Sequence, residues 1–410
     1  MNIAHLSDLH YCPKHLNDVD RAMRYAVDYI IDSDADVTVI SGDSFDASMG
    51  IHEPAVTAFL AQIVRLADEM PVLILQGTFS HDRPGALDML KPLMTRNPIL
   101  VADEPGQWAL EHHIDVKKDE IIRSFVPVSQ AETNKIEMVF SVLPSLNKAE
   151  PVVMKLGPIG YVEELMSRFR KVNDRMREEG VPTALVTHGT VNTSLTEHNF
   201  QMVSPDHEFT AEVLAGSGAQ ATLIGHIHKH QFFEHLGHTI AYPGSITRLV
   251  HGHHNLTGFL MWDIRPGRHS FEFIPTPARD LKEIEFDGPP DMAELALLAD
   301  DVDDNTHVRI RWTVDEEHAH AIDRDSIKEL FAQAGGLKLE GSINPVVSVR
   351  AAGIGKAFTL SDKLRHFCST SGDMDDFPAL DDRLTQLGID TTEAIVSRFL
   401  NPEQTLPKAA

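Results

Sequence analysis

Ala221-Thr222-Leu223-Ile224-Gly225-His226-Ile227-His228 is the stretch on which the interpretation of the whole sequence depends. Its first four residues are mostly apolar and predict a buried strand. Two histidines spaced two apart follow Gly225, so both imidazoles can face one cleft at the end of that strand. A histidine-rich surface turn is the alternative, because the chain contains 23 histidines. The choice depends on whether other strands end in the same way.

Four other strand-like runs also end in aspartate or histidine. They are 3–6, followed by Asp8 and His10; 37–40, followed by Asp43; 72–75, followed by His81; and 184–186, followed by His188. In α/β sheets, ligands bind at the carboxyl ends of the strands, so side chains delivered by separate strands can share one site. We therefore expect these strand ends to meet.

The composition is that of an ordinary globular protein with two or three domains. The chain has 410 residues, of which 42% are hydrophobic and 24% are charged. No apolar run reaches the roughly 18 to 20 residues that span a bilayer, and the N-terminus shows no secretory signal. Cys12 and Cys368 predict no disulfide framework. We expect a cytoplasmic protein without a membrane segment.

The formal net charge of −25 argues against a broad basic surface. Nucleic-acid-binding proteins usually carry a positive footprint. DNA as a substrate therefore requires that bound metal ions, a local basic patch or a partner subunit supply the attraction.

Three segments differ in their patterning. Residues 1–275 alternate apolar strands with amphipathic helices, which predicts an α/β sheet structure. Residues 276–352 combine alternating strands with short helices and predict a small α+β domain. Residues 353–410 predict a linker and short amphipathic helices, which either dock a partner or pack on their own chain.

The residues at the strand ends have the donor chemistry of a metal site. They are Asp8, His10, Asp43, His81, His188, His226 and His228. Mixed carboxylate and imidazole ligands suit Mn, Fe or Zn better than Ca, and seven candidates exceed one tetrahedral site. Two ions that share a bridging carboxylate are typical of phosphate-ester hydrolases, in which a nearby histidine can protonate the leaving oxygen.

The motifs resemble those of the calcineurin-like metallophosphoesterases. In order they are Asp8-x-His10, Gly42-Asp43-x-x-Asp46, His81-Asp82, His188-Gly189 and Gly225-His226-x-His228. Longer matches resemble the SbcD-type nuclease subunits of double-strand-break repair. These are His5-Leu-Ser-Asp-Leu-His10, Gly225-His-Ile-His-Lys229 and Tyr242-Pro-Gly-Ser-Ile-Thr-Arg248.

The resemblance implies a fold and a division of roles. The fold is a four-layer α-β-β-α metallophosphoesterase sandwich with an α+β capping domain and a C-terminal helical tail that docks an ATPase subunit. By motif, the first metal takes Asp8, His10 and His228, and the second takes His188 and His226, with Asp43 bridging. His81 protonates the leaving oxygen and Asp82 orients it, while Asp46 supports the site from behind the ligands. The two divalent ions are expected to be Mn²⁺, with Mg²⁺, Fe²⁺ and Zn²⁺ as alternatives.

Two positions need separate comment. The family motif Gly-Asn-His-Asp supplies an Asn ligand, but this chain reads Gly77-Thr-Phe-Ser-His-Asp82, with Ser80 at that position and Thr78 nearby. A hydroxyl is a poorer ligand than an amide carbonyl, so the second ion is expected to bind more weakly. Arg248 is expected either to contact a substrate phosphate or to be a surface residue without a role in binding.

Three functions follow as hypotheses. The first is an SbcD-like nuclease with double-strand 3′-to-5′ exonuclease and single-strand endonuclease activity. It would act as a homodimer on DNA in repair or recombination, together with an SbcC-like SMC-family ATPase. The second is a metallophosphoesterase that acts on a small nucleotide or a phosphoprotein, which the charge favours. The third is a scaffold subunit with an impaired second metal site.

Overall fold

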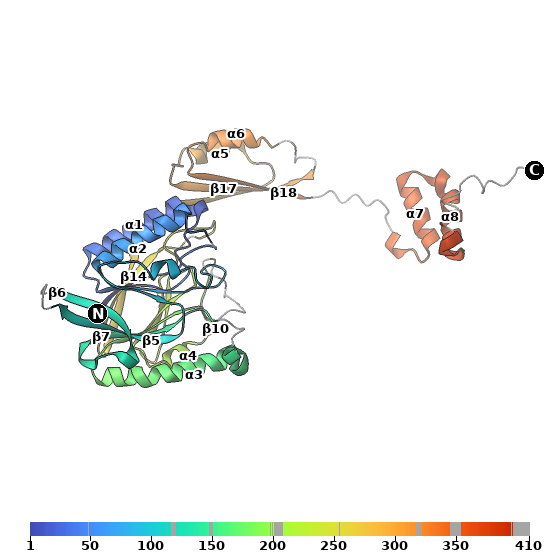
Figure 1. Ribbon diagram of the computed structural model, residues 1–410. Helices are drawn as coiled ribbons and strands as arrows, with labels where there is room; N and C mark the ends of the chain where they lie inside the picture. Colours follow the sequence, from blue (N-terminus) through green and yellow to red (C-terminus); the bar gives the residue numbers. More distant parts are fainter. Residues whose placement is uncertain are drawn as a thin grey trace, which may run out of the picture. The chain divides into compact units, whose positions relative to one another are not determined.

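The computed structural model describes residues 1–47, 49–115, 120–146, 151–196, 198, 200, 208–253, 255–316, 320, 322–344, 354–394 and 396. Figure 1 shows their helices and strands. Of the linker predicted at 351–355, residues 351–353 lie outside the described residues, as do the apolar positions Ile395, Phe399 and Leu400.

One large sheet carries the N-terminal strands. Its members are β1 Asn2–Leu6, β2 Val37–Ile40, β3 Val72–Leu75, β4 Ile99–Ala102, β14 Gly258–Arg265 and β15 Arg268–Pro275. The order is β15-β14-β1-β2-β3-β4, with β1 to β4 parallel and the other two antiparallel. Helices α1 (Leu16–Asp32) and α2 (Pro54–Glu69) cover its outer face (Figure 1).

The second large sheet carries the other half of the sandwich. Its members are β5 Gly106–Asp115, β6 Glu120–Pro127, β7 Ile136–Leu143, β8 Thr183–His188, β11 Ala221–Gly225, β12 Gln231–His235 and β13 His238–Tyr242. The order is β12-β13-β11-β8-β7-β5-β6. Helices α3 (Pro151–Glu178) and α4 (Ala211–Ala215) cover it, and β9 (Thr190–Val191) pairs separately with β10 (Glu208–Phe209).

Three apolar layers hold these elements together. Ala4 and Ile40 face α1 and α2, whereas their strand neighbours Ile3 and Val39 face the second sheet. A further layer lies between the second sheet and α3 with α4. Because both faces of the central strands are covered, those strands are continuous apolar runs in the sequence. The predicted α-β-β-α sandwich is confirmed.

Among the strands predicted from the sequence, β2 and β3 match in full, whereas β1, β8 and β11 extend beyond the predicted runs by one to three residues. The sequence interpretation did not identify β4, β12 or the β5–β6 hairpin. The hairpin mixes apolar residues with Glu111, His112 and His113, so its periodicity is weak.

A small sheet follows the sandwich in the sequence. It has the order β16-β17-β18, formed by β16 Asp280–Asp287, β17 Thr306–Asp315 and β18 Gly336–Asn344. Its helices are α5 (Met292–Ala299) and α6 (Arg324–Leu330), and the side chains of Asp291 and Asp323 cap their N-termini. The interpretation did not identify β18, and the domain boundary at residue 276 stays a prediction.

The chain divides into two compact units, each described by itself. The first contains both large sheets, the second contains α7 (Leu360–Ser371) and α8 (Phe377–Ile389), and β16 to β18 contribute to both. Thr359 caps α7 and Gly372 ends it at φ 84°, a left-handed conformation that glycine adopts readily.

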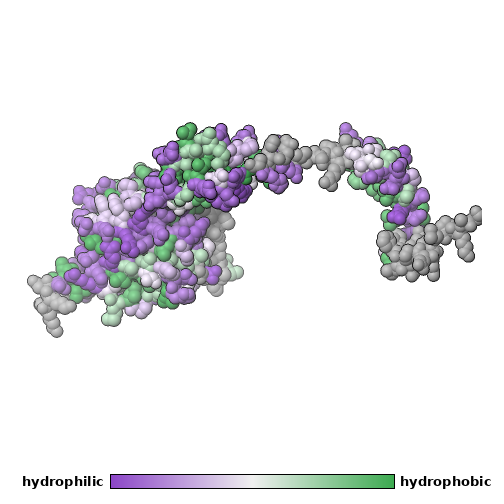
Figure 2. Space-filling view, turned by 90° about the horizontal axis from the view of Figure 1, so that it is seen from above, coloured by the Kyte–Doolittle hydropathy of each residue, from purple (hydrophilic) through white to green (hydrophobic). Residues whose placement is uncertain are grey.

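The exposed surface of the described residues is largely hydrophilic, with apolar side chains interspersed (Figure 2). Within those residues, every helix is too short or too polar to span a membrane.

Candidate metal centre

The first group of metal-ligand side chains joins the ends of β1 and β11. Asp8 and His10 follow β1, and His228 follows β11. The two Nε2 atoms of the histidines lie 3.0 Å apart, and each lies 3.9 Å from Oδ1 of Asp8. Two imidazoles and one buried carboxylate therefore converge from two different sheets, as a divalent ion requires.

The second group joins the ends of β2, β8 and β11. It comprises Asp43, His188 and His226, and their ligand atoms lie within 4.8 Å of one another. Nε2 of His188 is 3.2 Å from Oδ2 of Asp43. The backbone N–H of His226 also donates to both carboxylate oxygens of Asp8, at 3.1 and 3.0 Å, which ties the two groups together.

Unusual backbone conformations aim the ligands inward. Asp8, His10, Asp43 and His226 have φ values of 51°, 51°, 53° and 101°, a region that non-glycine residues seldom occupy. Such conformations persist at functional sites, where the surrounding structure fixes them. Each of these residues turns the chain sharply one to four residues after a strand ends, so the side chain reaches the site.

Glycines allow the loops to approach closely. A Cβ on Gly225 would lie 2.0 Å from Oγ of Ser7 and 2.9 Å from Nδ1 of His188. A Cβ on Gly42 would lie 2.4 Å from the same Nδ1. Both positions exclude a side chain because His188 lies directly against the backbone, so the site is closely packed around its ligands.

His188 is held in one orientation. Its Nδ1 donates to the carbonyl of Ser41 at 2.7 Å, which fixes the tautomer and directs Nε2 towards Asp43. Among the described residues this buried Nε2 has no hydrogen-bond partner. A buried ring nitrogen beside a carboxylate can serve as a metal ligand. The residues present therefore suit the divalent ions that the motifs imply.

The buried charges are strongly coupled. Burial alone would raise the pKa of Asp43, but His188 outweighs it and holds that pKa well below its usual range. Burial opposes protonation of His188, yet Asp43 raises the pKa of this histidine to about 9. Burial, with a further contribution from Asp43, raises the pKa of Asp8. Two buried carboxylates face one imidazolium here, so a bound cation would offset the remaining negative charge.

Asp46 connects His10 with His81. Its carboxylate Oδ1 lies 3.5 Å from Nδ1 of His10, and its carbonyl accepts from Nδ1 of His81 at 2.8 Å. The rings of His10 and His81 are edge to face at 4.7 Å. His10, Asp46 and His81 thus form a further group whose ligand atoms lie within 4.8 Å of one another, and His81 lies directly beside the first group.

Asp82 is buried and bonded to backbone groups of two loops. Its carboxylate accepts backbone N–H groups from Ser44, Phe45 and Gly77 at 3.0–3.2 Å, and its carbonyl accepts from the Gln76 amide at 2.9 Å. Its hydrogen bonds therefore join two loops, whereas the carbonyl of Asp46 orients His81. Burial, with Asp43 nearby, raises the pKa of Asp82 to about 6.

Thr78 contacts Asp43 directly, and Ser80 does not. The backbone N–H and the hydroxyl of Thr78 donate to Oδ1 of Asp43 at 2.7 and 2.8 Å. The exposed Ser80 reaches only the Thr78 hydroxyl, at 3.5 Å. The geometry thus favours Thr78 over the predicted Ser80 as the oxygen nearest the second group.

Arg248 is held by backbone and acidic partners. Its guanidinium donates to the carbonyls of Asn255 and Arg279 at 3.4 and 3.1 Å, and it lies 3.6 Å from Asp280. These contacts anchor the side chain of Arg248 within its own chain.

Sequence reasoning missed Tyr242 as a support of the site. Its fully buried hydroxyl donates to the carbonyl of Gly189 and accepts from the N–H of Val191, both at 2.8 Å. It therefore fixes the loop that follows His188. The only signal was its place in the Tyr242-Pro-Gly-Ser245 motif.

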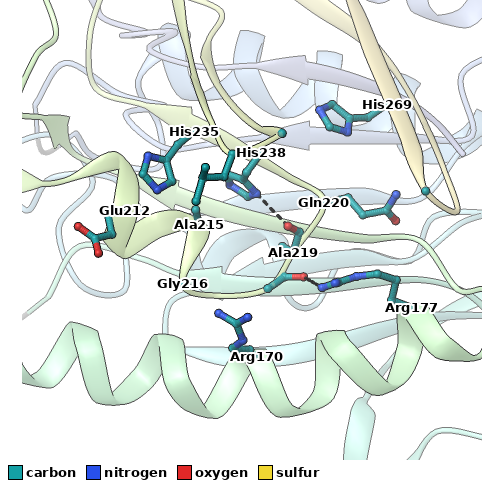
Figure 3. A pocket seen from close by; sticks show the side chains of 14 residues that line it. Arg170, Arg177, Glu212, Ala215, Gly216, Ala219, Gln220, His235, His238 and His269 are labelled. Carbon is teal, nitrogen blue, oxygen red and sulfur yellow. Dashed lines mark hydrogen bonds between the residues drawn. The ribbon is translucent and has the colours of Figure 1, made fainter.

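A cavity of about 630 Å³ lies away from this centre, where β11 and β13 begin (Figure 3). Arg177 and His238 each donate to a backbone carbonyl there, of Gly218 and Ala219 respectively. Arg170 and Arg177 both pair with Asp174, at 3.4 and 2.8 Å. The two arginines thus share one carboxylate, and the cavity is separate from the strand ends that bear the metal ligands.

Comparisons with known proteins give one family match and distant relatives. A family model described as calcineurin-like phosphoesterase matches residues 1–230. The DNA double-strand break repair protein Mre11 of Archaeoglobus fulgidus is 23% identical over 260 residues, covering 60% of this chain and 50% of that protein. The chain thus spans about half the length of this relative.

Two solved structures match part of the chain at low identity. GAP50, the anchor in the inner membrane complex of Plasmodium, has a TM-score of 0.42 and 14% identity, with 67% of this chain and 84% of that chain covered. A dimetal phosphatase from Danio rerio has a TM-score of 0.42 and 10% identity, with 66% and 95% covered.

Proposed function

The chain belongs to the calcineurin-like phosphoesterase family, and from this premise we propose that it is a two-metal DNA nuclease of the SbcD type. One observation carries the proposal: two three-residue ligand groups lie side by side, joined by the Asp8–His226 hydrogen bonds, with His81 next to them. This arrangement suits hydrolysis of a phosphodiester.

The residues have separate roles in this proposal. Asp8, His10 and His228 hold one ion, while Asp43, His188 and His226 hold the other, and Asp43 interacts electrostatically with both groups. When bound, the ions activate water and neutralise charge on the phosphoryl oxygens, and Mn²⁺ is the proposed metal. His81 donates Nδ1–H to the carbonyl of Asp46 and, as imidazolium, keeps Nε2–H for the leaving 3′ oxygen.

DNA is the proposed substrate on two grounds. The relative named a DNA double-strand break repair protein matches over 260 residues, and the longer motifs resemble SbcD-type subunits. The proposed activities are double-strand 3′-to-5′ exonuclease and single-strand endonuclease.

A partner subunit is proposed for the second compact unit. α7 and α8 enclose a hollow of about 490 Å³ lined by Leu364, Phe367, Leu380, Leu384 and Leu387. Phe367 and Leu387 remain 45% and 58% exposed, which is unusual for apolar side chains unless a partner covers them. We propose that these helices dock an SbcC-like SMC-family ATPase and that the nuclease acts as a homodimer.

The test measures release of nucleotides from labelled linear DNA by the purified protein with Mn²⁺. We expect Asp43→Ala and His81→Ala to abolish release, because one removes a shared ligand and the other removes the proton donor. His52→Ala is the control, since this side chain is 84% exposed and lies outside both groups. Hydrolysis of bis-p-nitrophenyl phosphate without DNA degradation would refute the nuclease proposal.

A second function is favoured by the charge. The net charge of −25 suits a small nucleotide or a phosphoprotein better than long DNA. Hydrolysis of such substrates with no action on DNA supports this candidate. A protein that hydrolyses nothing and binds one ion supports the scaffold alternative, which the replaced Asn motivates.

A further inference from the structure

An apolar hollow of about 270 Å³ lies beside the loops that carry Asp46 and His81. Its lining includes Phe45, Met49, Val56, Ala86 and Met89, together with Arg83. Most of these side chains are apolar, and Arg83 is the charged residue among them. Its volume is just below the roughly 300 Å³ at which small-molecule pockets begin, so it can take one ring system but not a whole drug-sized ligand.

The walls of the hollow are tied to the proton donor. Phe45 precedes Asp46, whose carbonyl holds His81, and the N–H of Phe45 donates to Asp82 at 3.2 Å. Arg83 is two residues beyond His81, so their Cα atoms lie within about 7.6 Å of each other. A group seated in the hollow is therefore close to the leaving oxygen that His81 protonates.

Arg83 is a cation without an acidic partner among the described residues. Its side chain is exposed, and within the part of the chain that the structure describes its one hydrogen bond is a backbone turn, in which its carbonyl accepts from the N–H of Ala86 at 2.8 Å. Arg248, by contrast, is occupied by Asn255, Arg279 and Asp280. Arginine forms paired hydrogen bonds to phosphate, so Arg83 can supply the local positive charge that an acidic protein needs for DNA.

We propose that Arg83 and this hollow form a subsite for the nucleotide on the leaving side of the scissile bond. The hollow accepts its base, and Arg83 binds the next phosphate along the strand. This subsite rests on the proposed nuclease function. It extends that function, because the protein would bind one base and one flanking phosphate in addition to the phosphate at the metal ligands.

The test compares two substrates in the full-length protein with Mn²⁺: a single-stranded oligonucleotide and bis-p-nitrophenyl phosphate, which has neither base nor flanking phosphate. Arg83→Ala should raise KM for the oligonucleotide about tenfold, the effect of one lost charge-assisted hydrogen bond, and change kcat little. Its effect on the small diester should be several-fold smaller. Arg175→Ala is the matched control, since it removes the same charge from an exposed position on α3.

Ala86→Leu tests the hollow independently of charge. It fills the space and should also raise KM for the oligonucleotide more than for the small diester. The subsite is refuted if Arg83→Ala and Arg175→Ala have the same KM for the oligonucleotide, or if Arg83→Ala raises KM equally for both substrates. Failure of the wild-type protein to cleave any DNA refutes the proposed function itself, and with it the subsite, so the two failures are distinct.

Discussion

Nε2 of His10 lies 3.0 Å from Nε2 of His228, although 218 positions separate the two residues in the sequence. Two unprotonated nitrogens repel at this distance, so a proton or a metal ion must lie between them. Two metal–nitrogen bonds of about 2.1 Å that meet at a right angle place their nitrogens about 3.0 Å apart. The pair is therefore arranged to share a cation.

Loss of His228 should remove one ion. In His228→Ala, Asp8 and His10 cannot complete the first group, so bound Mn²⁺ should fall from two ions to about one per chain in elemental analysis after desalting. His52→Ala should keep both ions. Two tightly bound ions in His228→Ala would contradict the assignment.

Metal affinity should rise with pH through His188. Asp43 outweighs burial and raises the pKa of His188 to about 9, so below that pH an ion must displace a proton from the ring. Affinity at the second group should increase up to about tenfold per pH unit between pH 6 and 9, with about one proton released per ion. Titration calorimetry in two buffers of different ionisation enthalpy measures this release.

The variant Asp43→Asn is the control for the pH dependence of metal affinity. Without the carboxylate, burial dominates and the pKa of His188 falls, so the pH dependence should flatten at neutral pH even though affinity is lower. A slope that stays unchanged in Asp43→Asn would show that another group releases the proton.

The sequence predicted the strands better than the contacts at their ends. Strands such as β2 and β3 are buried on both faces, so a run of apolar residues marks their bounds. The positions of the metal ligands could then be predicted, because ligands in α/β folds bind at the carboxyl ends of the strands. The partners of Asp82 and Arg248 were not predictable in this way. They are mostly backbone groups, which leave no pattern in the residue types.

Tyr242 is a further residue whose backbone partners the sequence did not reveal. Removing its hydroxyl in Tyr242→Phe leaves the buried N–H of Val191 and the carbonyl of Gly189 without that partner. We expect a stability loss of about 1–3 kcal/mol in urea unfolding, and about tenfold weaker Mn²⁺ binding at the second group. Tyr25→Phe, which makes the same change at an exposed position, should do neither. If both variants weaken Mn²⁺ binding equally, Tyr242 does not position the loop that follows His188.

Acid should destabilise the protein partly through His238. Burial lowers the pKa of His238 to about 4, against about 6.5 for an unfolded chain. The neutral ring therefore contributes full stability above pH 6.5, and this contribution, about 3 kcal/mol at most, is lost as the pH falls towards 4. Urea unfolding at pH 7.0, 5.5 and 4.5 should show a shallower pH dependence for His238→Gln. Parallel pH profiles for the two proteins would contradict this.

The second ion should depend on Thr78 more than on Ser80. The Thr78 hydroxyl lies 2.8 Å from Oδ1 of Asp43, whereas the Ser80 hydroxyl reaches only Thr78. Thr78→Ala should therefore weaken the second Mn²⁺ severalfold in a titration followed by electron paramagnetic resonance, while Ser80→Ala should change it little. Ser80→Asn restores the amide of the family motif, and an amide oxygen is a stronger ligand than a hydroxyl, so the second ion should bind more tightly. If Ser80→Ala weakens the ion more than Thr78→Ala does, the serine is the ligand and the loop must close further on the metal than the hydrogen bonds to Asp43 indicate.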